Sequence, residues 1–298
     1  MTTICIISDI HDWHSKVLKL ELEKKNCKVY SYKFSDLRLI LSRTKRIMFF
    51  KKKLKKFDGI WVRFISNGTI EEITFKLTIL HLLKDLGIYI HNSAGIIEKT
   101  VDKSRTSGIL KINNFETPNT WVFSEKNNLL DTKIFLNKKS LIYKPLFGSQ
   151  GKGIKILKNK NEFNQIIPVG GIYYIQEFIG NINAEIFWDL RVLVSNHKVI
   201  SVIKRISQNF ITNAFQGAKI EKIIYDKKIR EISTNISRLF KLGYGGLDLK
   251  IDRNKVFILE INSIPSWKAI QSVEEKNITE ILINDFLKNV KKYNNVKI

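Results

Sequence analysis

The chain has 298 residues, of which 44% are hydrophobic and 27% charged, a composition typical of a globular protein with two or three compact units. No apolar run approaches the ~20 residues of a membrane-spanning helix. The first ten residues lack the basic leader and apolar segment of a signal peptide, so we expect a cytoplasmic protein with no membrane partner. The two cysteines, Cys5 and Cys27, lie in or beside strand-like segments, which argues against a disulfide framework or a cysteine zinc site.

The chain carries 51 Lys and Arg against 28 Asp and Glu, and a formal charge of +23 would normally suggest a polyanionic partner. Most of this excess is spread along a chain rich in Lys, Ile and Asn, so we do not expect nucleic acid as a partner. The one dense basic cluster covers residues 43–56 and is interleaved with apolar residues. We interpret it as a solvated helix with one packed face, and a basic amphipathic helix for a membrane surface or RNA stays open.

The first 92 residues alternate strand-like and helix-like segments. Strands are predicted over residues 4–8, 29–34, 59–65 and 88–90. The first helix is predicted from the apolar residues Val17, Leu18, Leu20 and Leu22. Thr69 and Glu72 form a capping box before a second helix that ends at Gly87. This alternation predicts a parallel sheet covered on both faces, so residues 1–92 are expected to form an α/β domain.

Three polar or aromatic residues, Asp12, Trp13 and His14, follow the first predicted strand. Open α/β sheets bind ligands at the carboxyl ends of their strands, which makes these residues candidates for substrate contact. Capping of the following helix at the surface is the simpler interpretation.

A glycine-rich loop stands out in the middle of the chain, after a predicted helix over residues 95–111 and predicted strands over 120–123 and 141–145. Its glycines, Gly148, Gly151 and Gly153, let backbone amides point at an anion, as a phosphate-binding loop requires. It is not a Walker loop, because the Gly-Lys-Ser/Thr ending is absent and the next element reads as a strand. Lys144 precedes the loop and adds a cation there, although glycine turns between strands are also common without any ligand.

Charged residues recur on the later predicted strands. Residues 173–179 read as one strand, and 189–194 with 198–206 read as a hairpin joined by Ser-Asn-His. Asp189 and Arg191 share one face of this hairpin, and Arg205 lies on the partner strand. A helix is predicted from about residue 226 to 242.

The next hairpin, residues 245–262, carries acids where a core is expected. If its turn lies near Asn254, Asp248 pairs with Glu260 across the strands, and Asn262 shares the same face. Two adjacent carboxylates repel each other and are costly to bury, so the arrangement favours a hard divalent cation between them. A solvated hairpin face with ordinary acids is the alternative.

In this order, these residues resemble the ATP-grasp ligases, and the match runs from about residue 93 to 266. Within that superfamily the chain is similar to the RimK type. It most resembles the α-L-glutamate ligases linked to tetrahydromethanopterin, through the segments Trp61–Phe64 with Gly68 and Thr69, Val101–Ser104, Lys144–Gly151, Ile211–Ala218 and Glu260–Trp267. The resemblance implies an ATP-grasp fold of the α/β (α+β) class. We expect a pre-ATP-grasp domain over residues 1–92, a central subdomain with the glycine-rich flap over 93–180 and a C-terminal subdomain with the metal site over 181–298.

The resemblance also implies roles for individual residues. Asp248, Glu260 and Asn262 would bind two Mg²⁺ ions, or Mn²⁺. Arg191 and Arg205 would be catalytic, facing the transferred phosphate and the substrate carboxylate, where a guanidinium forms bidentate contacts. The residues expected to bind ATP are Lys103, Lys144, Gly148, Ser149, Gly151, Gly153, Gln176, Glu177, Phe178, Ile179, Asp189 and Asn213. Among them, residues 176–179 would line the adenine pocket.

The implied reaction joins L-glutamate to a carboxylate acceptor, with a tetrahydromethanopterin-type pterin as the expected acceptor. The carboxylate would attack the γ-phosphate of ATP, and the glutamate amine would capture the acylphosphate, which requires positioning and charge neutralisation but no protein nucleophile. Ala218 stands where many RimK-type enzymes have a second glycine, which argues against a protein tail as acceptor. A protein tail or another small acid remains the alternative acceptor, and a basic nucleic-acid-binding protein without catalysis is the alternative of another class. Homo-oligomerisation stays open.

Overall fold

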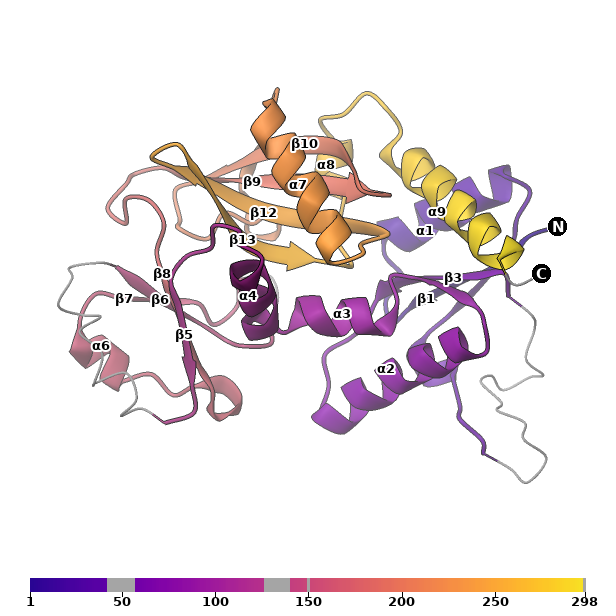
Figure 1. Ribbon diagram of the computed structural model, residues 1–298, viewed down its shortest axis with the longest axis horizontal. Helices are drawn as coiled ribbons and strands as arrows, with labels where there is room; N and C mark the ends of the chain where they lie inside the picture. Colours follow the sequence, from indigo (N-terminus) through magenta and orange to yellow (C-terminus); the bar gives the residue numbers. More distant parts are fainter. Residues whose placement is uncertain (42–56, 126–139, 149–150, 297–298) are drawn as a thin grey trace.

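The computed structural model describes residues 1–41, 57–125, 140–148 and 151–296 of the chain (Figure 1). The basic cluster predicted over residues 43–56 and the flap residue Ser149 lie outside the described residues.

The first unit is a parallel four-stranded sheet in the order β2-β1-β3-β4, as predicted. Its strands are β1 (Thr3–Ser8), β2 (Lys28–Tyr32), β3 (Gly59–Phe64) and β4 (Tyr89–His91). Helices cover both faces because successive side chains of a buried strand alternate between them. Ile4 and Ile6 pack towards α1 (Trp13–Lys24) and α9 (Ile278–Asn295), whereas Cys5 and Ile7 pack towards α2 (Ile70–Asp85).

The start of α2 and the buried face of α1 were both predicted from the sequence. The capping box is confirmed: Thr69 Oγ1 accepts from the Glu72 N–H, and Glu72 Oε2 accepts from the Thr69 N–H. In α1 the predicted apolar pattern is partly wrong. Leu18 and Leu22 are buried one turn apart, but Leu20 is 57% exposed because it points away from that face of the helix.

The second unit is an antiparallel sheet in the order β5-β8-β6-β7. Its elements are β5 (Thr120–Phe123), β6 (Leu141–Lys144), β7 (Lys155–Leu157), α6 (Lys160–Asn164), η3 (Val169–Gly171) and β8 (Tyr173–Glu177). The single helix predicted over residues 95–111 is wrong, because it is divided into α3 (Ala94–Val101) and α4 (Lys103–Ile112). Asp102 causes the break, since its side chain caps α4 by accepting from the Arg105 N–H and its own backbone is extended.

The third unit is an antiparallel five-stranded sheet in the order β11-β10-β9-β12-β13, and α7 packs on one face of it. Its elements are β9 (Phe187–Ser195), β10 (Lys198–Ser207), η4 (Ala214–Gln216), β11 (Lys219–Lys222), α7 (Lys227–Leu239), β12 (Tyr244–Asp252), β13 (Lys255–Asn262) and α8 (Lys268–Gln271). The short η1 (Phe34–Asp36) belongs to the first unit. The boundaries expected at residues 92 and 180 both fall between sheets, and we propose them as domain boundaries.

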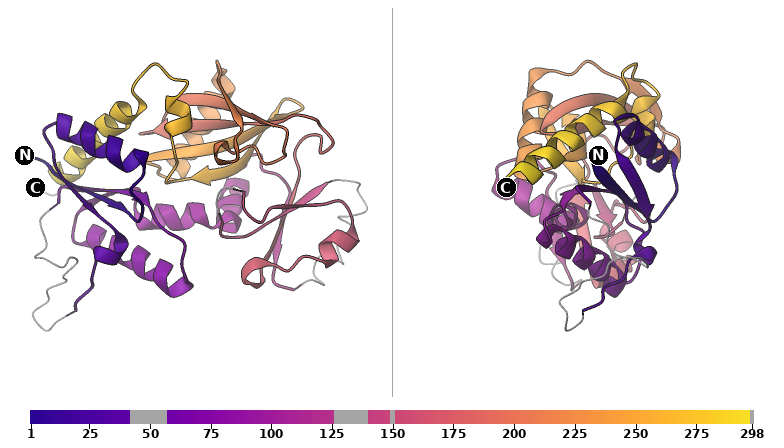
Figure 2. Two further views of the ribbon diagram at one scale, coloured as in Figure 1. Left: turned by 180° about the vertical axis from the view of Figure 1, so that it is seen from behind. Right: turned by 90° about the vertical axis from the view of Figure 1, so that its right-hand side faces the viewer.

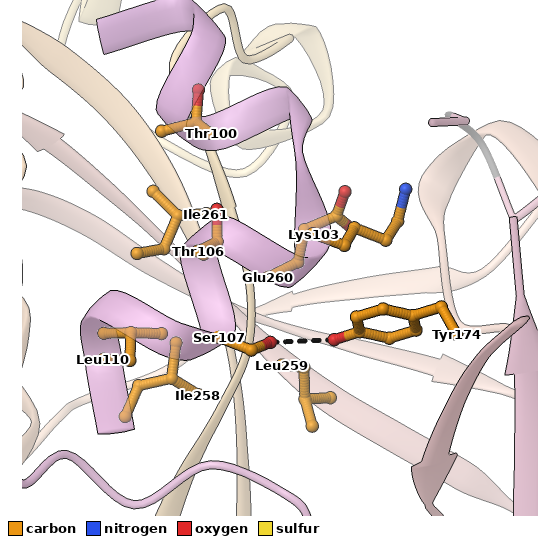
Figure 3. Close-up of a pocket in the computed structure, with 10 residues that line it drawn as sticks. All are labelled: Thr100, Lys103, Thr106, Ser107, Leu110, Tyr174, Ile258, Leu259, Glu260 and Ile261. Carbon is orange, nitrogen blue, oxygen red and sulfur yellow. Dashed lines mark hydrogen bonds between the residues drawn. The ribbon is translucent and has the colours of Figure 1, made fainter. Parts of the chain in front are cut away.

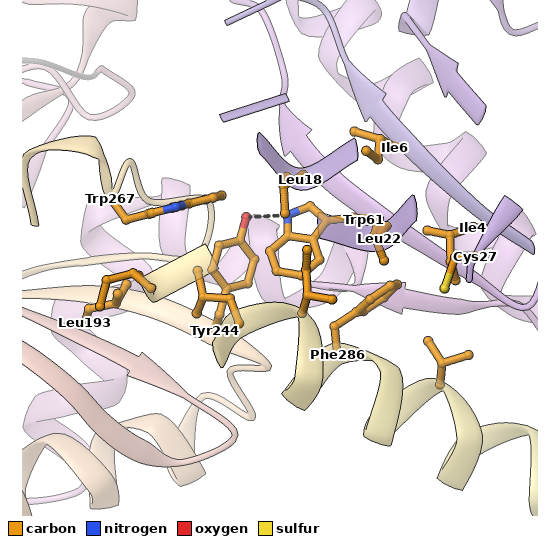
Figure 4. Close-up of a cluster of buried hydrophobic side chains, with 14 of the residues drawn as sticks. Ile4, Ile6, Leu18, Leu22, Cys27, Trp61, Leu193, Tyr244, Trp267 and Phe286 are labelled. Carbon is orange, nitrogen blue, oxygen red and sulfur yellow. Dashed lines mark hydrogen bonds between the residues drawn. The ribbon is translucent and has the colours of Figure 1, made fainter. Parts of the chain in front are cut away.

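The C-terminal helix α9 returns to the first sheet and lies beside α1 (Figures 1 and 2). Around it, aromatic side chains from the first and third units form one buried cluster (Figure 4). Trp61 Nε1 donates to the Tyr244 hydroxyl, and the Trp61 ring lies 5.1 Å from that of Phe286. Because the first and third units both contribute side chains to this core, they are expected to unfold together. Among the described residues, no helix has the length and apolarity needed to cross a bilayer.

This packing predicts different costs for two equal truncations in α1. Leu22→Ala leaves a cavity in the cluster shared with α9 and is expected to lower the free energy of unfolding by about 2–5 kcal/mol. Leu20→Ala is the matched control, because its exposed side chain should contribute less than about 1 kcal/mol. Urea denaturation followed by tryptophan fluorescence measures both, and equal losses would contradict the packing.

Candidate active site

The acidic hairpin formed by β12 and β13 has the predicted pairing of Asp248 with Glu260, although the local geometry differs from the simple expectation. Arg253 and Asn254 both have positive φ and form a two-residue turn, which by itself would place Asp248 opposite Leu259. A β-bulge between Leu249 and Asp248 inserts Leu259 as an extra residue and moves Glu260 opposite Asp248. The bulge therefore aligns the two carboxylates.

Asp248 is buried against two arginines from neighbouring strands. Arg191 Nη2 and Arg205 Nη2 each lie 3.0 Å from Asp248 Oδ2, and Arg191 Nε lies 2.5 Å from Oδ1 in an ion pair that is not aligned as a hydrogen bond. Arg205 also makes a bidentate pair with Asp189, at 2.7 Å from Nε and 2.5 Å from Nη2. The prediction that Arg205 lies on the partner strand is confirmed, and the register places it directly opposite Asp189.

The charges of this cluster stabilise one another. Burial opposes ionisation of Asp248, but Arg191 and Arg205 together hold the pKa of that carboxyl below its usual value. Burial raises the pKa of Asp189 despite the facing guanidinium. The pKa of Arg205 is raised by Asp248 and Asp189, although burial acts in the other direction. Arg205 therefore stays charged.

Two lysines face Glu260 from other elements. Lys103 begins α4 and donates to the backbone carbonyls of Leu146 and Gly148, at 3.3 and 3.0 Å. Lys144 ends β6 and donates to Gln176 Oε1 at 2.7 Å. One hollow is lined by both lysines, Glu260 and the glycine-rich loop.

A second hollow, lined by residues of α4, β13 and β8, shares Lys103 and Glu260 with the first (Figure 3). There the Ser107 and Tyr174 hydroxyls are hydrogen-bonded at 2.8 Å. Both were missed by sequence reasoning. Tyr174 could have been found, because it lies two residues before Gln176 on β8 and so shares its face.

Burial disfavours the protonated, positively charged form of both lysines. It lowers the pKa of Lys144 to about 8, against the opposing effect of Glu260, and it also lowers the pKa of Lys103. An ammonium held with few counter-charges is poised to bind an anion, because a bound anion restores its favoured protonated state.

The glycine-rich loop approaches the segment that precedes β11. Gly151 has φ +72°, and a Cβ there would lie 2.6 Å from Ile211 Cγ2 and 3.0 Å from Asn213 Nδ2. Gly153 has φ +76°, and a Cβ there would lie 2.9 Å from Pro145 Cγ. Glycine is therefore required at both positions for conformation and for space. Asn213 itself caps η4, its Oδ1 accepting from the Gln216 N–H.

The remaining predicted nucleotide residues lie at and after the end of β8. Gln176 is buried, and its amide nitrogen donates to Thr120 Oγ1 and the Tyr174 hydroxyl. Its side chain therefore orients Lys144. Glu177 accepts from Asn119, and Phe178 makes an edge contact with Phe187. Ile179 follows in the loop and is partly exposed.

The donor set of the hairpin fits a hard cation. Asp248, Glu260 and Asn262 offer carboxylate and amide oxygens, the ligand type of Mg²⁺, and buried Asp248 Oδ1 has an ion pair with Arg191 but no aligned hydrogen bond. No group of three His, Cys, Asp or Glu suited to a metal occurs in the described part of the chain, which is consistent with a site of two carboxylates and an amide. Four cationic side chains face three carboxylates here, an excess that suits a polyphosphate carried with a metal ion.

The N-terminal candidates lie on the other side of the segment after β13. Asp12 caps α1, accepting from the Ser15 N–H, so the predicted cap is confirmed, but the predicted surface location is wrong because Asp12 pairs with the buried Arg63. Trp13 and His14 begin the helix, and their rings lie near that of Trp267.

Comparison with known proteins agrees with this arrangement. Residues 100–286 match the family model of the RimK-like ATP-grasp domain. The chain is 28% identical, over 97% of its length and 99% of the relative, to a tetrahydromethanopterin:alpha-L-glutamate ligase of Methanococcus maripaludis. It is also 28% identical to a coenzyme gamma-F420-2:alpha-L-glutamate ligase of the same organism, over 76% of this chain and 82% of that protein.

Solved structures share the fold at low identity. The ATP-grasp ligase PsnB, complexed with a phosphomimetic variant of its minimal precursor, Mg and ADP, superimposes with a TM-score of 0.74 and 15% identity, covering 97% of this chain and 99% of that one. D-alanine–D-alanine ligase from Bacillus anthracis, complexed with ATP, gives 0.67 at 15% identity and covers both chains fully. The family match spans more than half of the chain and agrees with the fold and the charged hairpin, so this chain belongs to the RimK-like ATP-grasp family and is a ligase of the class that forms amide bonds.

Proposed function

We propose that this enzyme uses ATP and Mg²⁺ to join L-glutamate to the carboxylate of a small acceptor of the tetrahydromethanopterin type. The observation that carries the proposal is the facing pair of charges: Lys103 and Lys144 on one side of a hollow, and the Asp248–Glu260 pair on the other. The phosphates of a nucleoside triphosphate would supply anions for the two lysines, and its metal ion would supply a cation for the two carboxylates.

The residues then have distinct roles. Lys103 and Lys144 bind the phosphates, and the backbone around Gly148, Gly151 and Gly153 closes over them. Gln176 holds Lys144, and the segment through Ile179 carries the adenine. Asp248, Glu260 and Asn262 hold two Mg²⁺ ions, or Mn²⁺, which when bound neutralise charge on the phosphates. Asn213 lies beside the glycine-rich loop, close to the same phosphates.

The chemistry requires two successive nucleophilic attacks, one at phosphorus and one at carbon. A carboxylate oxygen of the acceptor bonds to the γ-phosphorus while the bond to the ADP oxygen breaks, and the glutamate amine then attacks the acyl carbon, releasing phosphate and a proton. Arg191 is the guanidinium proposed to meet the transferred phosphate, because it is paired with Asp248 alone, whereas Arg205 is paired with both Asp248 and Asp189. Arg205 is held by Asp189 and keeps Asp248 in position. Its positive charge stabilises the negative charge of the phosphate nearby.

The pterin acceptor is supported by the relative that the chain matches along nearly its whole length. The second relative carries another acceptor in its name, and the structural neighbours bound to precursor peptides share only the fold. The experiment is mass spectrometry of products after incubation with ATP, Mg²⁺, glutamate and a panel of reduced pterins, a deazaflavin acid and carboxyl-terminal peptides. A glutamyl adduct on a pterin, with matching ADP release, is the expected result. An adduct only on a peptide or on the deazaflavin would replace the acceptor, and no ADP release with any acceptor would overturn the proposal.

Glu260→Gln tests the metal site. Because it removes one of the two carboxylates, we expect glutamate-dependent ADP release to fall at least about a hundredfold. The melting temperature should stay close to wild type, since Glu260 is only partly buried. Glu231→Gln on the exposed face of α7 is the control and should keep full activity. Wild-type turnover in Glu260→Gln would refute the assignment.

The pKa of Lys144 predicts how nucleotide binding depends on pH. The lysine loses its proton as the pH rises through about 8, so the affinity for Mg²⁺-ADP should fall about tenfold between pH 7 and 9. Lys144→Met carries no charge at any pH, so it should bind weakly at pH 7 with a smaller further loss. Lys155→Met, exposed on the neighbouring strand, should behave as wild type. Isothermal titration calorimetry measures all three, and an unchanged affinity up to pH 9 in the wild type would contradict the role of Lys144.

A further inference from the structure

A polar cluster joins the first unit to the segment 263–268, on the side away from Lys103 and Lys144. Asp12 Oδ2 lies 2.8 Å from both His14 Nδ1 and Arg63 Nη2. His14 Nε2 faces the backbone N–H groups of Trp267 and Lys268, at 3.1 and 3.2 Å. His14 and Arg63 are 5% and 3% exposed, so this cluster is built into the interior and is not a surface arrangement.

These contacts determine the tautomer of His14. A backbone N–H can only donate, so Nε2 accepts from Trp267 and Lys268 and carries no proton. The proton of the neutral ring is therefore on Nδ1 and is donated to Asp12. Arg63 Nη2 donates to the same carboxylate oxygen and also lies 2.9 Å from Nδ1, so this tautomer has one contact between two donors, and the guanidinium lies 5.6 Å from the ring centre of Trp267. A protonated Nε2 would place a third donor against the two N–H groups.

The segment held by His14 begins at the proposed metal site. Asn262 Oδ1 accepts from the Ile264 N–H, and Ser263 is fixed by hydrogen bonds to Thr100 and Asn92. Pro265 then packs beside Gly246: a Cβ on that glycine would lie 3.1 Å from Pro265 Cβ and 2.6 Å from Arg191 Nη1. Only a glycine leaves room for both. The turn held by His14 and the side chain of Arg191 thus both approach Gly246.

We propose that His14, as the neutral Nδ1–H tautomer, is a positioning residue that fixes the 264–268 turn beside Arg191 and so shapes the wall of the site where the acceptor carboxylate meets the phosphate. It acts through the turn and does not touch the phosphates. The effect on the acceptor rests on the proposed function, whereas the tautomer of His14 and its hydrogen bonds to the turn do not.

Charges around His14 set the direction of its pH dependence. Arg63 faces it from β3, Lys268 from α8 and Asp12 from the start of α1, and the other neighbours are the Ser266 hydroxyl and the rings of Trp13 and Trp267. Burial, Arg63 and Lys268 lower the pKa of His14, and Asp12 opposes them. The neutral form is therefore favoured in the folded protein, and the hold on the turn is present above the ordinary histidine pKa and lost as the pH falls through the lowered one.

Two substitutions separate positioning from simple packing. His14→Gln keeps an oxygen acceptor near the position of Nε2 but cannot be protonated, whereas His14→Leu fills similar space without an acceptor. We expect His14→Leu to lower kcat/KM for the acceptor about tenfold or more, with the affinity for Mg²⁺-ADP unchanged. His14→Gln should stay within about threefold of wild type at pH 7.5 and lose the decline in rate at acid pH. His81→Gln, an exposed histidine on α2, is the control and should keep both the rate and its pH profile.

The outcomes are distinguishable from failure of the proposed function. If the wild-type enzyme shows no glutamate-dependent turnover, the proposed function fails. ¹⁵N NMR of the His14 ring and Mg²⁺-ADP titration of the variants then still test the tautomer and the integrity of the nucleotide site. A protonated Nε2 at pH 7.5, an acceptor kcat/KM unchanged in His14→Leu, or an equal loss in both His14 variants would overturn the inference.

Discussion

The buried ion pairs of Asp248 with Arg191 and Arg205 are the interaction on which the site depends. They bring together β9, β10 and β12, three adjacent strands of one sheet. Each of these charged side chains can be buried only because a side chain of opposite charge lies beside it. Asp189 completes the set by holding Arg205 from both nitrogens. These ion pairs hold the charged side chains in place, so the residues need little reorganisation when a charged substrate arrives.

The opposite wall of the site is built from elements that are distant in the sequence. Lys103 comes from the start of α4, a helix that exists because Asp102 interrupts the longer helix and caps its second half. Lys144 comes from β6 and is oriented by Gln176 of β8. Both lysines are desolvated, so their charge is directed at Glu260 and at the space between the walls.

The first unit reaches this site through the segment that follows β13. His14, Asn92 and Thr100 all hydrogen-bond to residues 263–268, and α9 then packs on the first sheet. After β13 the chain therefore returns to the unit in which it began. The first unit therefore contacts the turn that leads away from the acidic hairpin.

Local patterns in the sequence predicted much of this protein. The alternation of apolar segments predicted the parallel sheet, Thr69 and Glu72 predicted a helix start, and the period of two placed Asp189 and Arg191 on one face. These features depend on residues close together in the chain, for which spacing alone sets geometry. The pairing of Asp248 with Glu260 was also predicted, but it is achieved by the bulge at Leu259, which the turn alone would not produce.

Other features were decided only by the tertiary structure. Leu20 fits an apolar pattern but is exposed, because the direction of the α1 face depends on where α9 packs. The desolvation of Lys144 and the tautomer of His14 follow from neighbours contributed by residues 176 and 267–268, far along the chain. The sequence by itself therefore determined which charged groups and which strands the protein has. Burial and long-range contacts, which arise only when the sheets meet, decided which of those groups face one another and in which protonation state.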